Sequence, residues 1–178
     1  MLLDLRYYDD PILREKCEEI GEITAEIKQL AQDMIETMML DNRGSGLAAP
    51  QVGHTSRIFV TAMTTVNEDD EVVYERPYVF INPILSDPSE ETVAHQEGCL
   101  SIPKLFVYVN RPKEITCEYT DVDGKRHKER FEGWFARAIM HENDHLNGVL
   151  HIDRTTRRER NEIQGDLRRI KKKFAKKT

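Results

Sequence analysis

The segment His141-Glu142-Asn143-Asp144-His145 constrains the fold more than any other part of the sequence. Residues i and i+4 of an α-helix lie on one face, so both imidazoles can reach a single metal ion. The intervening glutamate then lies beside the metal, where a carboxylate acts as a general base on water. The segment therefore predicts a buried metal-binding helix, with Glu142 as a candidate catalytic residue.

Two histidines do not complete a catalytic metal site, because such sites use three protein ligands and keep one position open. The sequence offers two candidates for the third ligand. Cys99, in the segment Glu97-Gly98-Cys99-Leu100-Ser101, would supply a thiolate, which binds divalent transition metals strongly. His151 would complete the pattern H-E-x-x-H-x-x-G-x-x-H over residues 141–151, which is the signature of metzincin proteases.

Several observations favour Cys99 as the third ligand. Metzincins have a methionine turn downstream of the metal-binding helix, whereas all six methionines of this sequence precede His141. The segment after His151 reads as a basic helix and not as the lower half of a protease cleft. The sequence also lacks the disulfide pattern typical of extracellular proteases. We therefore interpret His151 as a surface or packing histidine, and a metzincin-like metalloprotease that uses it remains the alternative.

The distribution of apolar residues predicts an α+β fold. Helical periodicity covers residues 24–40, strand-like runs follow at 57–62, 71–85, 105–110, 114–120 and 125–131, and helical periodicity returns at 133–147 and 155–177. We predict one domain over residues 1–178. It should contain mixed or antiparallel β-sheets around a central metal-binding helix, with an N-terminal helix and a basic C-terminal helix at 155–177.

The charge is unevenly distributed along the chain. The net charge is −6, but the segment from Arg154 onward contains 11 Lys or Arg against three acids. Such a segment is either a solvated helix face or an electrostatic contact with RNA or another polyanion. The sequence has no apolar run of the roughly 20 residues that a membrane helix needs, and its N-terminus has no signal-peptide or transit-peptide character. We therefore expect a cytoplasmic protein that does not enter a membrane.

Three segments together resemble the signature motifs of peptide deformylases. They are Gly44-Ser45-Gly46-Leu47-Ala48-Ala49-Pro50-Gln51, Glu97-Gly98-Cys99-Leu100-Ser101 and His141-Glu142-Asn143-Asp144-His145-Leu146. The motifs occur in the family's order, and the likeness extends from Asp10 to Asp153. Three residues depart from the family pattern. Met140 stands where Gln is usual, Ser45 replaces an apolar residue, and His151 stands where Phe is common.

The resemblance implies a role for each motif residue. Cys99, His141 and His145 would bind the metal, and Glu142 would act as general base. The Gln51 side chain and the Leu100 backbone N–H would stabilise the oxyanion. The remaining implied contacts are with the substrate: Gly44, Gly46 and Gly98 would allow its backbone to approach, and Arg137 and Ala138, with Leu100 and His141, would line a slot for methionine.

The resemblance also implies an activity, a cofactor and partners. The activity is metal-dependent hydrolysis of the N-formyl group from the N-terminal formylmethionine of nascent polypeptides, with release of formate. The cofactor would be one divalent metal ion, Fe(II) in the cell, for which nickel, cobalt or zinc could substitute. The basic C-terminal helix would contact the ribosome, close to the nascent substrates.

Overall fold

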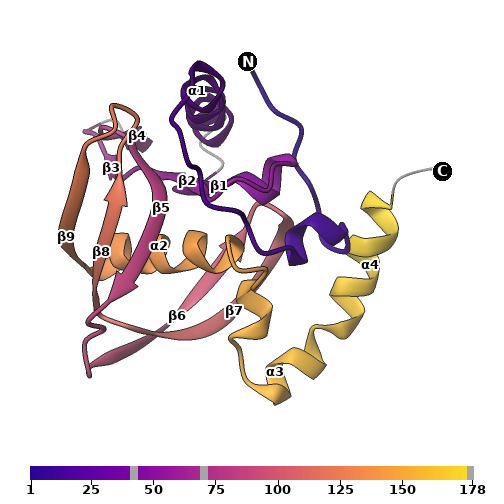
Figure 1. Cartoon of the computed structure of the whole chain (residues 1–178). Coiled ribbons are helices and arrows are strands. Elements are labelled where there is room, and N and C mark those ends of the chain that lie inside the picture. Colours follow the sequence, from indigo (N-terminus) through magenta and orange to yellow (C-terminus); the bar gives the residue numbers. More distant parts are fainter. Residues whose placement is uncertain (41–43, 69–71, 176–178) are drawn as a thin grey trace.

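The computed structural model of the chain describes residues 1–40, 44–68 and 72–175 (Figure 1). Its elements, in chain order, are η1 (Pro11–Arg14), α1 (Ala25–Met39), β1 (Gly46–Ala48), η3 (Ala49–Val52), β2 (Ile58–Thr61), β3 (Thr64–Val66), β4 (Val72–Tyr74), β5 (Tyr78–Ser86), β6 (Thr92–Cys99), β7 (Ile102–Pro112), β8 (Glu114–Thr120), β9 (Arg126–Glu132), α2 (Gly133–His145), η4 (His151–Asp153), α3 (Arg157–Glu162) and α4 (Gln164–Phe174).

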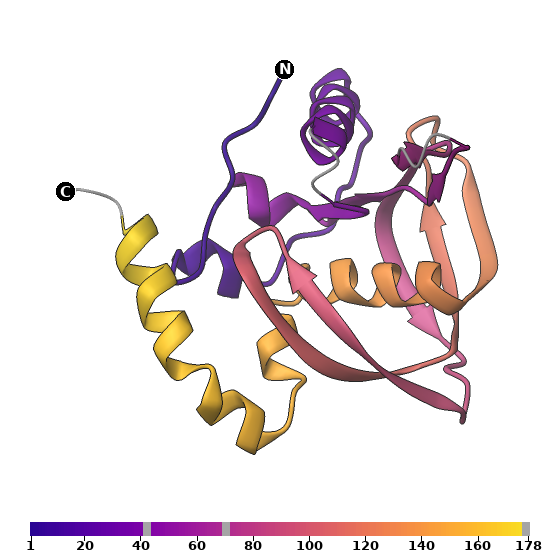
Figure 2. The ribbon, with the colours of Figure 1, turned by 180° about the vertical axis from the view of Figure 1, so that it is seen from behind.

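The strands of the described residues form three separate antiparallel sheets. Five strands are ordered β1-β2-β5-β8-β9 in the largest sheet, β6 pairs with β7, and β3 pairs with β4. Helix α2 crosses the middle of the molecule, with the large sheet on one side and the β6–β7 hairpin on another (Figures 1 and 2). Helix α1 packs on β1 and β2, and α4 packs on β7. The predicted α+β fold is confirmed.

Helix α1 has the single buried face that its apolar periodicity predicts. Thr24 is the N-cap and accepts a hydrogen bond from the Ile27 N–H. Met34 and Met38 are fully buried and pack in one core cluster with Ile58 of β2. The methionines of this helix therefore contribute to the apolar core.

Helix α2 is buried on two sides, which explains how polar side chains come to lie in the middle of the protein. Ile139 and Met140 pack in the core cluster that contains Phe80 of β5. His141 and Glu142 face a cavity on another side of the helix. Met140, one of the departures noted above, is therefore a core residue, and an apolar side chain suits that position.

Most of the predicted strands are present, although their bounds differ. The runs at 57–62 and 114–120 correspond to β2 and β8, whereas the run at 71–85 is two strands, β4 and β5. Glu71, where that run was predicted to begin, lies outside the described residues. Strand β5 accommodates Pro83 because its pairing with β8 shifts register between Ile81 and Ile84. The sequence pattern missed β1, β3 and β6, and β6 is too polar and exposed to show hydrophobic alternation.

The basic C-terminal helix predicted over residues 155–177 is present in the described part of the chain, but as two helices, because α3 ends at Glu162 and α4 begins at Gln164. Ile163 between the helices and Leu167 in α4 are buried in a core cluster with Val107 of β7. The turn at Ile163 keeps the apolar side of this segment against β7 while its basic residues stay exposed. Residues 176 and 177 of the predicted helix lie outside the described part of the chain. Across residues 1–40, 44–68 and 72–175, no helix is long and apolar enough to cross a membrane.

Candidate active site

Three potential metal ligands meet between α2 and the end of β6. The ligand atoms of Cys99, His141 and His145 lie within 4.8 Å of one another, and the Cys99 Sγ lies 3.3 Å from the His145 Nε2. Helix α2 places its two histidines one turn apart on the same face. Strand β6 brings Cys99 to them, because its pairing with β7 shifts register between Glu97 and Cys99 and redirects the strand end.

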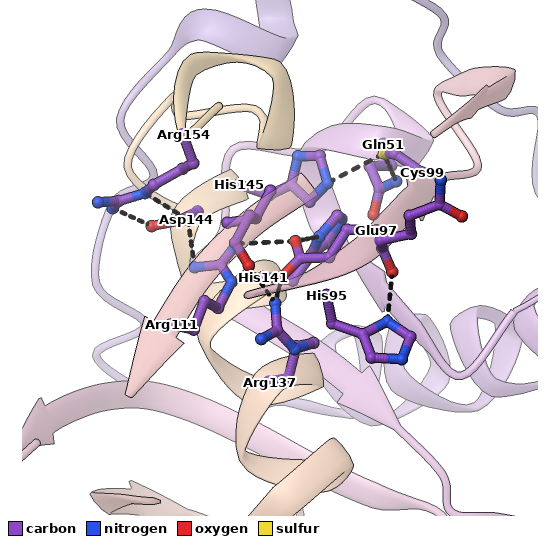
Figure 3. A network of polar contacts seen from close by, with 12 residues as sticks. Gln51, His95, Glu97, Cys99, Arg111, Arg137, His141, Asp144, His145 and Arg154 are labelled. Atoms are coloured by element: carbon purple, nitrogen blue, oxygen red, sulfur yellow. Dashed lines mark hydrogen bonds and ion pairs between the residues drawn. The ribbon is translucent and has the colours of Figure 1, made fainter. Parts of the chain in front are cut away.

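A buried carboxylate orients the first of these histidines. Glu97 Oε2 lies 2.9 Å from His141 Nδ1, which leaves Nε2 as the nitrogen that faces the other ligands (Figure 3). Arg111 donates to both Glu97 oxygens, from Nε at 2.6 Å and from Nη2 at 3.0 Å. Burial raises the pKa of Glu97, but the hydrogen bonds from His141 and Arg111 outweigh it and hold the pKa well below its usual range. The ionised carboxylate therefore fixes the tautomer of His141, which would make this histidine a stronger ligand for a metal ion.

Glu142 is a second buried carboxylate beside the ligand cluster. Burial raises its pKa from 4.5 to about 7. Its position depends on Gly46 of β1, because a Cβ at Gly46 would lie 2.8 Å from Glu142 Cγ and Cδ and would overlap Oε1. Glycine at position 46 therefore leaves room for the carboxylate beside the cluster.

The Gln51 side chain is buried and held at both ends. Its Oε1 accepts a hydrogen bond from the Ala48 N–H at 2.8 Å. Its Nε2 donates to Ser101 Oγ at 3.2 Å and to Cys99 Sγ at 3.4 Å. The amide group therefore points at the ligand cluster, and Leu100, which follows Cys99, lines the same space.

A cavity of about 480 Å³ connects these groups. All of the sequence-predicted site residues except His145 line it: Gly44, Gly46, Gln51, Gly98, Cys99, Leu100, Arg137, Ala138, His141 and Glu142. His145 is fully buried behind the cavity. The structure thus gathers residues that lie far apart in the sequence around one space.

Two large side chains of the cavity were missed by the sequence reasoning. Phe106 of β7 and Trp134 of α2 line the cavity while remaining 60 % and 50 % exposed. The Trp134 ring meets His95 edge-on, with ring centroids 4.9 Å apart. Trp134 lies seven residues before His141, so helical periodicity could have identified it. We find no sequence pattern that marks Phe106.

His151 lies outside the ligand cluster, although its ring is 5.7 Å from that of His141 between centroids. It is 1 % exposed, and burial lowers its pKa from 6.5 to about 4. A neutral, buried ring beside His141 is a packing residue. Of the two interpretations of His151, as a surface or as a packing histidine, the burial of the ring supports packing, and the metzincin alternative is not favoured.

The residues of the cluster fit a divalent transition metal. One thiolate and two imidazoles are a donor set that catalytic metal sites use with a fourth position left open. His145 directs its Nε2 toward the Cys99 Sγ, 3.3 Å away, so the ring presents a nitrogen to the same point as the thiolate. Together with the buried carboxylate of Glu142, this arrangement is that of a metal-dependent hydrolase.

Comparison with known proteins identifies the family. The family model of polypeptide deformylases matches residues 2–161. A peptide deformylase of Novosphingobium aromaticivorans is 40 % identical over 177 residues, covering 92 % of this chain and 94 % of the relative. One from Rhizobium meliloti is 46 % identical over 144 residues, covering 81 % and 79 %. The crystal structure of peptide deformylase from Ehrlichia chaffeensis has a TM-score of 0.86 and 37 % identity, covering 97 % of each chain.

The chain belongs to the polypeptide deformylase family. Its activity is the removal of the N-formyl group from nascent formylmethionyl peptides.

Proposed function

We propose that Glu142 is the catalytic base of this deformylase and that Cys99, His141 and His145 hold its metal ion. The observation that carries the proposal is the buried Glu142 carboxylate beside the ligand cluster, with its pKa raised to about 7. A base with a pKa near the working pH both accepts and returns a proton efficiently. A protein that merely stored a metal ion would need neither this carboxylate nor the buried amide of Gln51.

A divalent metal held by Cys99, His141 and His145 would supply Lewis-acid activation of a water molecule and would lower the pKa of that water toward neutrality. Glu142 takes a proton from the water as its oxygen attacks the formyl carbon, and then gives the proton to the departing amine. The Gln51 Nε2 and the Leu100 backbone N–H donate to the oxygen of the formyl group, on which negative charge develops. Loss of one such donor typically lowers kcat by about 10²–10³. The products are formate and a peptide with a free amino terminus.

We propose that bare backbone at Gly44, Gly46 and Gly98 lets the substrate pair as an added strand. A Cβ at Gly98 would lie 2.7 Å from the Phe106 ring, so this glycine also accommodates the aromatic side chain. The methionine side chain would enter between Leu100, Ala138 and His141, which line the cavity.

We propose Fe(II) as the metal in the cell, with nickel, cobalt or zinc able to substitute. A thiolate combined with imidazoles suits all of these ions, and the family resemblance favours iron. Metal analysis of protein purified without oxygen tests the proposal. Fe(II) should be the main ion, and exposure to air should inactivate the iron form faster than a nickel form. Zinc as the main ion in the oxygen-free preparation would contradict it.

The proposed mechanism is tested by formate release from formyl-Met-Ala-Ser by protein loaded with Fe(II) or Ni(II). One formate per peptide, intact peptide bonds and loss of turnover in Glu142→Ala would support it. A folded, metal-loaded protein that releases no formate would refute it.

We also propose that the protein is cytoplasmic and that the basic face of α4 contacts the ribosome. Arg168, Lys172 and Lys173 are exposed, whereas Leu167 on the other side of the helix is buried. Deleting the helix would expose the core, so charge substitution is the cleaner test. Changing these three residues to Gln should weaken co-sedimentation with ribosomes in low salt. The same change at Lys125, Arg126 and Lys128 on the β8–β9 hairpin is the control, and equal binding by both variants would refute the ribosome contact.

A further inference from the structure

The metal ligands come from two elements that share little backbone contact. The backbone of α2, which carries both histidines, packs against β1, β2, β8 and β9. Cys99 belongs instead to the β6–β7 hairpin, which approaches α2 mainly through side chains. The separation between the thiolate and the imidazoles therefore depends on the side chains that connect the hairpin to the helix.

Arg137 makes three such connections from α2. Its Nη1 donates to Glu97 Oε1 at 2.7 Å and to the Val109 carbonyl at 2.9 Å, and its Nη2 donates to the Val93 carbonyl at 2.5 Å. Val93 and Glu97 belong to β6, and Val109 belongs to β7. One side chain thus holds both strands of the hairpin, one turn before His141.

Arg111 makes the reciprocal connection from β7 to α2. It binds both oxygens of Glu97, and its Nη1 donates to Asp144 Oδ2 of α2 at 2.9 Å. Arg154 donates to the same carboxylate, from Nη2 to Oδ1 at 2.6 Å (Figure 3). Arg137 therefore reaches from the helix to the hairpin, and Arg111 reaches from the hairpin to Asp144 of the helix. Both arginines also bind Glu97.

We infer that Arg137 is a positioning residue for the metal centre. It holds Glu97 against His141 and fixes the hairpin on α2, so that Cys99 and the two histidines stay within reach of one ion. The inference rests on the proposed function of the site. It also changes the role predicted for Arg137, which was expected to contact the substrate. The side chain is 8 % exposed and its guanidinium is taken up by Glu97 and two carbonyls, so little of it remains for a substrate.

Three variants test this role. Arg137→Met keeps an unbranched buried side chain and removes all three connections. Arg137→Lys keeps the positive charge and can restore one connection. Arg158→Met removes an exposed arginine and is the control. Cobalt affinity is measured by competition with a chelator. The Co(II) absorption spectrum reports the ligand geometry, and kcat and KM are measured with formyl-Met-Ala-Ser.

We expect Arg137→Met to bind Co(II) about 10- to 100-fold more weakly, the usual effect of losing an outer-shell partner of a ligating histidine. The Co(II) spectrum of Arg137→Met should change, and its kcat should fall while its KM stays nearly unchanged. Arg137→Lys should recover part of the cobalt affinity. Arg158→Met should match the wild type in all of these measurements. Wild-type cobalt affinity and spectrum in Arg137→Met, with a raised KM alone, would overturn the inference in favour of a substrate contact. If Arg137→Met does not fold, Arg137→Lys provides the test. Wild-type cobalt affinity and an unchanged Co(II) spectrum in Arg137→Lys would also overturn the inference. These outcomes do not depend on formate release, whose absence in the wild type would instead refute the proposed function.

Discussion

Replacing Gly46 with alanine should displace Glu142, the proposed catalytic base, without touching any of the proposed metal ligands. The added Cβ would overlap Glu142 Oε1 and would lie 2.8 Å from Cγ and Cδ, whereas ordinary contacts begin at 3.4 Å. Cγ and Cδ must therefore withdraw by about 0.6 Å and Oε1 by more. A misplacement of about 1 Å at a catalytic group costs on the order of 10²-fold in rate. We therefore expect kcat to fall about 10- to 100-fold, which is about 1.4–2.7 kcal/mol of transition-state stabilisation.

The assay is formate release with Ni(II)-loaded protein, and two other glycines provide a graded comparison. Gly21→Ala should be silent, because a Cβ there meets nothing within 4 Å. Gly44→Ala should lie between the two, because its Cβ would meet the flexible Leu100 side chain at 3.3 Å. Metal content should be the same in all of these variants.

A double-mutant cycle separates displacement of the base from obstruction of the substrate. Overpacking should make Gly46→Ala about 1–3 kcal/mol less stable than the wild type in urea unfolding. In a Glu142→Ala background the carboxylate is gone, so the same substitution should cost little. An equal loss of stability in both backgrounds, or wild-type kcat in Gly46→Ala, would refute the reasoning.

Three further predictions concern the same site. Cys99→Ala should abolish Co(II) binding and formate release while His151→Ala keeps both, and the reverse pattern would restore His151 as a ligand. Metal-free Glu142→Gln should become more stable than the metal-free wild type as pH rises. The folded-state pKa of Glu142 is raised to about 7 from 4.5, so the wild type loses stability through this window, by up to about 3 kcal/mol. Urea unfolding at pH 5 and pH 8 measures this, and a difference independent of pH would contradict it. Trp134→Ala should open the cavity and raise kcat/KM for formyl-Phe peptides relative to formyl-Met peptides. An unchanged ratio of the two kcat/KM values would show that Trp134 does not restrict the size of the first side chain of the substrate.

The parts of the site that the sequence predicts are those set by local geometry. His141, Glu142 and His145 share a helix, and the 3.6-residue repeat places the two histidines on one face wherever that helix lies. The N-cap at Thr24 is local in the same sense, because it depends on a hydrogen bond to a residue three positions later. The fold class also followed from periodicity, whereas β6 was missed because few of its side chains are buried.

The tertiary structure decided everything that depends on segments far apart in the chain. The register shift at the end of β6 brings Cys99 to α2, and packing against β7 turns the C-terminal segment at Ile163. Burial also distinguishes Arg137 from His151, since two carbonyls and a carboxylate enclose the Arg137 guanidinium whereas His151 packs as a neutral ring. The spacing of side chains along a helix depends only on hydrogen bonds between residues a few positions apart. Burial and strand register are set by the whole chain, and the sequence pattern alone does not contain them.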